Sequence, residues 1–61
     1  MEGLEEQHNE KINVAHAMIN NGGSFVIKLG ELILRADHIN LAKIKKTWPD
    51  YWLKYRDVAT R

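Results

Sequence analysis

The sequence predicts an all-α protein of three to four short helices, packed as a compact bundle that homo-oligomerisation completes. Apolar residues recur at spacings of three and four along most of the 61 residues, as they do on the buried face of a helix. Glycine, serine, aspartate and proline stand where such segments stop and start. No stretch alternates apolar and polar residues for long enough to predict a strand.

The chain is too short to form a large core. Its 61 residues are expected to form a single helical domain, residues 1–61. A domain of that size buries only about 60% of the surface that its unfolded form exposes. Disulfides, a bound metal or a partner chain commonly supply the missing stability. Because the sequence has no cysteine, disulfides and thiolate zinc sites are excluded, and association between copies remains.

A cytoplasmic protein without a membrane partner is expected. No basic start precedes an apolar run, and no apolar stretch reaches the roughly 18 residues that a membrane span needs. The lack of cysteine also agrees with a reducing compartment.

Charge is unevenly distributed along the chain, although the net charge is only +1. Residues 1–10 contain four glutamates and no lysine or arginine, whereas residues 43–61 contain six basic and two acidic side chains. Solvated helix faces explain most such charges. Alternatively, the acidic and basic ends attract each other within or between chains, or the basic end meets phosphates.

The first helix is expected over residues 2–20, where apolar residues fall mostly at helical spacing (Leu4, Ile12, Ala15, Met18 and Ile19). Few of them lie in residues 1–10, so those residues are expected to fray unless a partner covers them. Asn20, Asn21 and Gly22 form the predicted helix stop. A left-handed conformation at Asn21 or Gly22 closes such an end.

The second helix follows at once and is the most apolar part of the sequence. Ser24 is the expected N-cap. Polar Lys28, Glu31 and Arg35 form one narrow stripe, and most of the remaining circumference is apolar. Because two other short helices cannot cover such a helix on all sides, we expect a second copy to cover the rest.

Gly30 lies inside this helix, where glycine costs about 1 kcal/mol relative to alanine. A glycine there indicates either the close approach of a partner helix or simply a small residue on a crowded face. The predicted oligomer interface comprises Phe25, Leu29, Gly30, Ile33 and Trp52.

Two more helices complete the chain. Asp37 is expected to cap a third helix over residues 38–47, unless it lies inside one longer, kinked helix. Pro49 breaks the helical hydrogen bonding and suits the first position of a fourth helix. Trp48 and Trp52 are expected in the core, with Tyr51 and Tyr55 half exposed.

No enzyme, cofactor or metal site is expected. Ser24 with His16 or His38 matches no hydrolytic signature, and Ser24 has a sufficient role as a cap. His8, His16 and His38 include no pair one helical turn apart that would hold a metal ion.

The start of the second helix is the candidate ligand site: Gly22, Gly23, Ser24 and Lys28. Free backbone N–H groups, a hydroxyl and the positive helix end suit an anion such as the phosphate of a nucleotide. The spacing matches no known phosphate-binding motif. A helix stop followed by a cap is the simpler interpretation.

A DNA-binding regulator that uses Lys43, Lys45 and Lys46 is the alternative function. Aromatic residues interleaved with cations after residue 44 would suit nucleic acid, but the core needs most of these aromatics. The third helix offers few base-reading side chains beyond its lysines, and a net charge near zero disfavours strong nonspecific binding.

Several short motifs occur together in residues 22–55. They are Gly22-Gly23-Ser24-Phe25-Val26, Leu29-Gly30, Ala36-Asp37, Asn40, Lys43-Ile44 and Trp48-Pro49-Asp50-Tyr51-Trp52 with Tyr55. In this pattern the chain resembles small helical proteins of bacteriophages and prophages. The resemblance implies a viral accessory role in the host cytoplasm and assigns no site residue. Since small phage proteins often act by binding, we expect inhibition of a host protein or sequestration of a phosphate-bearing defence signal.

Overall fold

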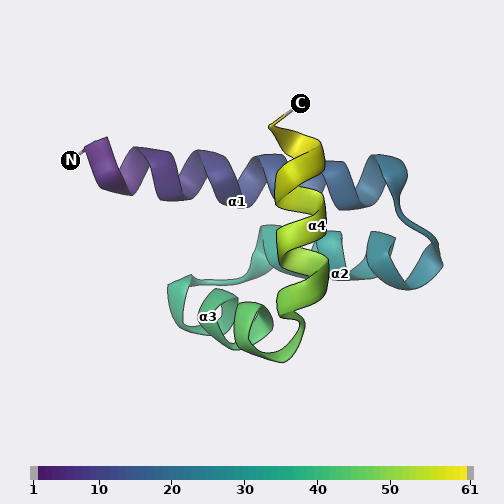
Figure 1. Cartoon of the computed structure of the whole chain (residues 1–61). Coiled ribbons are helices and arrows are strands. Elements are labelled where there is room, and N and C mark those ends of the chain that lie inside the picture. The colour runs from purple at the N-terminus through teal and green to yellow at the C-terminus, as the bar shows by residue number, and fades with distance from the viewer. Residues whose placement is uncertain (1, 61) are drawn as a thin grey trace.

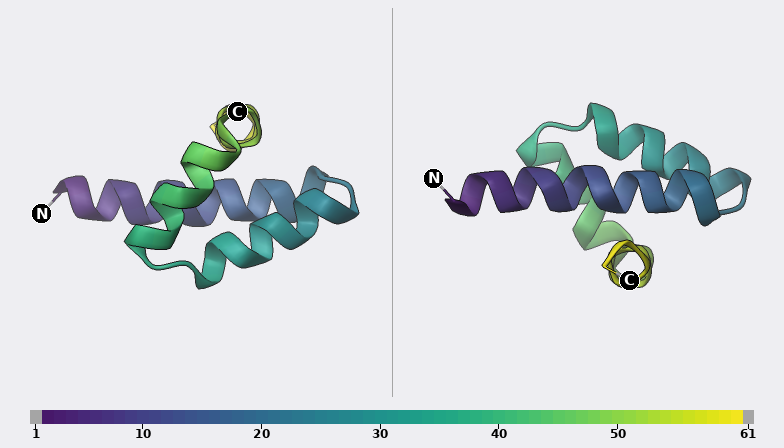
Figure 2. Two further views of the ribbon diagram at one scale, coloured as in Figure 1. Left: turned by 90° about the horizontal axis from the view of Figure 1, so that it is seen from below. Right: turned by 90° about the horizontal axis from the view of Figure 1, so that it is seen from above.

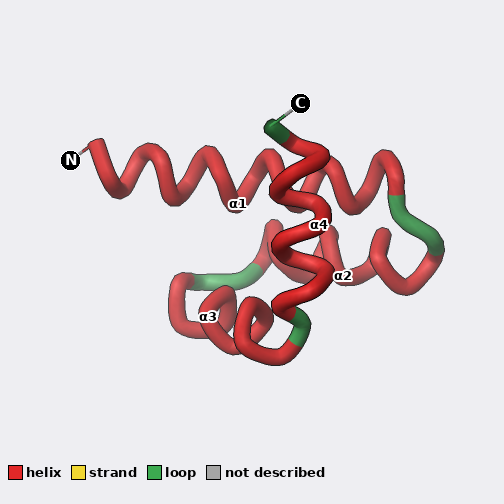
Figure 3. Tube along the Cα trace, in the orientation of Figure 1, coloured by secondary structure: helices red, strands yellow, loops and turns green. Residues whose placement is uncertain are grey.

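Four helices follow one another with connections of only one or two residues (Figures 1 and 3). They are α1 (Glu2–Asn21), α2 (Ser24–Arg35), α3 (His38–Thr47) and α4 (Pro49–Ala59). The computed structural model describes the backbone of residues 2–60 and the side chains of residues 9–60. Within that part of the chain the predicted compact all-α fold is confirmed. The side chain of Leu4 is outside the described part of the chain. Most of the residues 1–10, which were expected to fray, also have side chains outside that part.

The helices α1 and α2 form an antiparallel pair, and α4 runs across α1 on another side (Figures 1 and 2). The first turns of α1 extend past the end of α2 (Figure 2). A helix does cross closely at Gly30, and it is α1 of the same chain: a Cβ atom at Gly30 would lie 2.7 Å from the carbonyl oxygen of Ala15. Glycine therefore lets the α1 and α2 backbones approach each other.

The core draws on all four helices. Its buried residues are Val14, Ala15, Ala17, Met18, Val26, Leu29, Ile33, Ala36, Ile44, Trp52 and Tyr55. Val14 and Ala17, which the helical pattern of α1 did not single out, are buried because α1 contacts both α2 and α4. Tyr55 was expected to be half exposed and is instead buried, whereas Trp48 is only half buried.

The helices α3 and α4 begin at the residues that the sequence predicted. Asp37 caps α3, because its Oδ1 accepts a hydrogen bond of 2.8 Å from the backbone N–H of Asn40. Pro49 begins α4. At the end of α2, Lys11 Nζ donates to the carbonyl oxygen of Ala36 over 2.6 Å. This bond satisfies a carbonyl at the negative end of α2 and ties it to α1.

The turn between α1 and α2 differs from the prediction in two ways. Ser24 is the first residue of α2, and Gly23 occupies the N-cap position without a side-chain hydrogen bond. No described residue has a positive φ, so the left-handed closure expected at Asn21 or Gly22 is wrong. Close packing explains Gly22 instead, since a Cβ there would lie 2.6 Å from the carbonyl oxygen of Met18.

The sequence predicted no segment that spans a membrane. Among the described residues, none of the four helices is long and apolar enough to cross a bilayer.

Candidate functional site

The start of α2 leaves its first backbone N–H groups open. Gly23 and Ser24 are exposed, and no side chain caps the helix. A Cβ at Gly23 would meet nothing within 4 Å, so the space in front of the helix is free. The first intrahelical bond joins the N–H of Ile27 to the carbonyl oxygen of Gly23 at 2.9 Å. Donors earlier in the helix therefore face solvent at its positive end.

Lys28 lies one turn into α2 and has a partner on its own helix. Its Nζ is 3.4 Å from a carboxylate oxygen of Glu31, and both side chains are well exposed. Such a surface pair contributes little stability, so Lys28 can leave it at small cost. The four predicted ligand residues thus lie together around the start of α2: Gly22, Gly23, Ser24 and Lys28. The lysine among them is paired with Glu31.

The predicted interface residues divide into one exposed and four buried positions. Leu29, Ile33 and Trp52 are buried within the single chain, and Gly30 packs against α1. The rest of the chain covers almost all of these side chains, and Leu29 keeps only an edge at the surface beside Phe25. Phe25 is different, because 57% of its surface is exposed.

Phe25 borders a shallow apolar hollow of about 180 Å³. We call this hollow the Phe25 groove; its lining residues are Phe25, Lys28, Leu29, Leu32 and Trp48. The Phe25 ring contacts Trp48 edge to face, with centroids 6.0 Å apart, and lies 5.9 Å from the ring of Tyr51. Leu32 lies two helical turns after Phe25 on the same face of α2 and is 50% exposed. Two large apolar side chains thus flank a hollow with an aromatic wall.

A second hollow, of about 230 Å³, lies between α2 and α3. It has cationic and apolar sides, and we call it the Arg35–Lys43 cleft; its lining residues are Leu32, Arg35, Ala36, Asn40, Lys43 and Ile44. Leu32 belongs to both hollows, so the Phe25 groove and the cleft lie on either side of one residue.

The basic and aromatic residues of α3 and α4 pair largely with each other. Lys45 Nζ lies 4.5 Å from the ring centroid of Trp52, and Lys54 Nζ lies 5.4 Å from that of Tyr55. Both rings are buried, so their faces are not free to stack on bases.

Two of the three histidines lie in the part of the chain whose side chains are described. His16 and His38 are exposed, and His8 lies outside that part. The described residues contain no group of three acidic or histidine side chains that could hold a metal ion. The absence of catalysis, of a cofactor and of a metal remains a prediction.

Comparisons with known proteins give no relative for this chain: no family model, curated protein or solved structure matches it. A function therefore has to rest on the surfaces that the chain itself presents.

Proposed function

We propose that the chain is a non-catalytic binding protein that works as a homo-oligomer, with the Phe25 groove at its subunit interface. One observation carries the proposal: among the described residues, Phe25 and Leu32 are the two exposed large apolar side chains that lie beside this apolar hollow.

Burial of this surface would stabilise an assembly. Apolar surface removed from water contributes about 25 cal/mol per Å², so two large side chains matter in a small domain. An association that involves only the folded state also stabilises that state by mass action. Phe25 is held against Trp48 and Tyr51, so little side-chain entropy remains to be lost on binding.

The biological role that we propose is that of a phage accessory protein, which inhibits a host protein or sequesters a phosphate-bearing defence signal. The resemblance of residues 22–55 to small phage proteins supports the viral role. The open N–H groups at the start of α2 support the phosphate ligand. Lys28 lines the Phe25 groove and lies one turn from that start, so an assembly through the groove would bring the candidate anion site close to a second copy.

Sedimentation velocity over a range of micromolar concentrations tests the association. We expect an oligomer, and we expect Phe25→Ala and Leu32→Ala each to weaken association at least tenfold, because each removes apolar area from the interface. Leu34→Ala and Ile39→Ala are matched controls, since both side chains are exposed and neither lines the groove. A wild-type chain that sediments as a folded monomer throughout, or controls that act like the groove variants, would contradict the proposal.

Calorimetric titration with a panel of nucleotides tests the phosphate ligand. We expect heat with at least one nucleotide, and a loss of up to roughly fivefold in affinity on Lys28→Ala, because an exposed ion pair with a phosphate contributes up to about 1 kcal/mol. Lys46→Ala is the control, as it removes the same charge from α3. The ligand branch fails if no nucleotide gives heat, or if Lys28→Ala and Ser24→Ala both bind like the wild type.

A DNA-binding regulator remains the alternative, and the Arg35–Lys43 cleft favours it by placing two cations beside Asn40. Gel shifts across a salt series separate the two functions. Retention of DNA at physiological ionic strength, lost on Lys43→Ala, would favour the regulator.

A further inference from the structure

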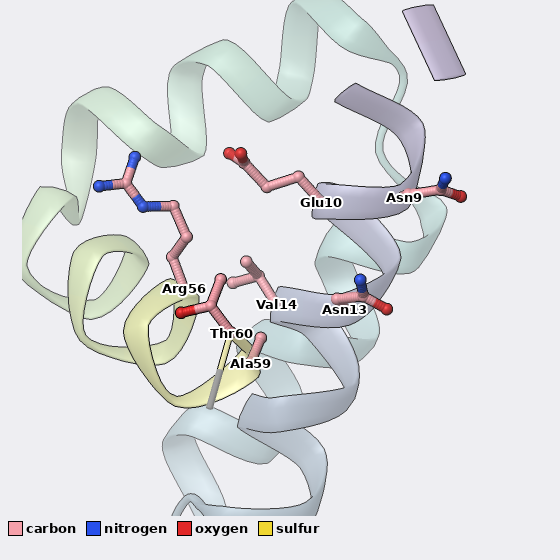
Figure 4. A pocket seen from close by; sticks show the side chains of 7 residues that line it. All are labelled: Asn9, Glu10, Asn13, Val14, Arg56, Ala59 and Thr60. Atoms are coloured by element: carbon pink, nitrogen blue, oxygen red, sulfur yellow. The ribbon is translucent and has the colours of Figure 1, made fainter. Parts of the chain in front are cut away.

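A cavity of about 440 Å³ lies where the last turns of α4 meet the middle of α1. Figure 4 shows the seven residues that line it: Asn9, Glu10, Asn13, Val14, Arg56, Ala59 and Thr60. Its volume falls in the range of small-molecule sites, roughly 300–1,000 Å³. None of its residues belongs to the start of α2 or to the Phe25 groove, so it is a separate site.

A small apolar surface and two opposite charges define this cavity. Val14 lies beneath it with no exposed surface, so the half-buried Ala59 is the apolar side chain that a ligand can contact. Glu10 extends from α1 towards the α4 side, Arg56 extends from α4, and both charged ends reach beyond Val14 in this view (Figure 4). The cavity therefore has an acceptor group on its α1 side and a donor group on its α4 side.

The two charged groups do not neutralise each other. Among the residues whose side chains are described, no hydrogen bond or ion pair engages the carboxylate of Glu10 or the guanidinium of Arg56. Thr60 is partly engaged, because its Oγ1 donates to the carbonyl oxygen of Asp57 over 3.0 Å, and its lone pairs remain able to accept. A carboxylate, a guanidinium and a hydroxyl are thus available to one ligand.

We propose that this cavity binds a guanine-type base. A carboxylate accepts two N–H groups side by side, and guanine presents such a pair at N1 and N2. A guanidinium donates two parallel hydrogen bonds, and the O6 and N7 atoms of guanine are the acceptor pair that arginine most often reads. The side chain of the half-buried Ala59 offers an apolar contact to the flat face of the ring.

The charges also argue against a phosphate in this cavity. Glu10 repels an anion, and Arg56 is the only lysine or arginine among the described residues that line the cavity. Together the two side chains are neutral, so they favour a neutral group with one donor edge and one acceptor edge over a phosphate. The site therefore goes beyond the proposed function, because it recognises a base without needing a phosphate.

Titration of the ¹⁵N-labelled protein with guanosine, followed by amide chemical shifts, tests the proposal. We expect saturable shifts concentrated in residues 9–14 and 56–60. Inosine lacks the N2 amine and should bind several-fold more weakly than guanosine. Adenosine has neither the N1 and N2 donor pair nor the O6 and N7 acceptor pair, and it should bind at least tenfold more weakly. Guanosine carries no phosphate, so this result is independent of the nucleotide titration at the start of α2.

Variants connect the binding to its two polar groups. We expect Glu10→Gln and Arg56→Gln each to weaken guanosine at least tenfold. Arg56→Lys, which keeps the charge and loses the planar fork, should weaken it similarly. Glu31→Gln and Arg35→Gln remove one negative and one positive charge from the polar stripe of α2. These two variants should bind guanosine with the affinity of the wild type. The proposal is overturned if adenosine or an amino acid zwitterion binds as tightly as guanosine. It is also overturned if Glu10→Gln or Arg56→Gln binds guanosine with unchanged affinity.

Discussion

Replacement of Ile33 by alanine is expected to lower the free energy of unfolding by about 2–5 kcal/mol. Ile33 is fully buried among residues of the core and is one of its three largest enclosed side chains. A 61-residue domain has a total stability of roughly 3–9 kcal/mol, estimated from 0.05–0.15 kcal/mol per residue. The substitution therefore removes a large part of the stability. Urea unfolding followed by circular dichroism measures it.

Leu34→Ala is the matched control for this prediction, because Leu34 follows Ile33, is exposed and does not line the Phe25 groove. We expect Leu34→Ala to change the free energy of unfolding by less than about 1 kcal/mol. The comparison also decides which role Ile33 has. If Ile33→Ala left the unfolding midpoint unchanged in dilute solution and only weakened association, Ile33 would belong to an interface rather than to the core.

A side chain at Gly30 is expected to force α1 and α2 apart. The added Cβ of Gly30→Ala would lie 2.7 Å from the carbonyl oxygen of Ala15 and 3.0 Å from Met18 Cβ. Overpacking of this kind costs about 1–3 kcal/mol, and alanine recovers up to about 1 kcal/mol through its higher helix propensity. We expect a net loss of about 1–2 kcal/mol for Gly30→Ala, and about 3 kcal/mol for the bulkier Gly30→Val. Thermal unfolding gives both values.

Gly23→Ala separates this steric effect from the general effect of replacing glycine. A Cβ at Gly23 meets nothing within 4 Å, so only the poorer capping by alanine remains, at less than about 1 kcal/mol. The backbone approach at Gly30 would be refuted if Gly30→Ala raised the melting temperature, as helix propensity alone predicts.

Residues that act on their own backbone made the helix ends predictable. Asp37 caps α3 and Pro49 begins α4, because a carboxylate or a pyrrolidine ring acts within one turn of itself. The α1–α2 turn was harder to predict. Serine is normally the better cap, but Gly22 must pack against Met18, and the helix begins with Gly23 at the N-cap position.

Burial depends on neighbours that are distant in sequence, which explains why four of the five predicted interface residues are buried within the single chain. The apolar pattern of α2 identified a helix that its own chain cannot cover entirely, and Phe25 and Leu32 do remain exposed. The same pattern could not show which of its faces α1 would cover, so Leu29 and Ile33 were expected at an interface. Their burial comes from contacts that periodicity within one helix does not contain.

The cavity between α1 and α4 had only an indirect signal in the sequence. Glu10 lies in the acidic start of the chain and Arg56 in its basic end, and attraction between the two ends was one expectation. The fold brings both side chains to one cavity without pairing them. No spacing rule finds such a pair, because the two residues meet only through the crossing of the first and last helices.

That crossing has a consequence for synthesis of the protein on the ribosome. The segments farthest apart in sequence complete the core, since α4 supplies Trp52 and Tyr55 against the α1 residues Val14 and Met18. A chain that stops before residue 52 lacks both aromatic side chains, so its α1–α2 pair leaves exposed the apolar surface that α4 otherwise covers. Premature termination there would therefore release a chain prone to aggregation.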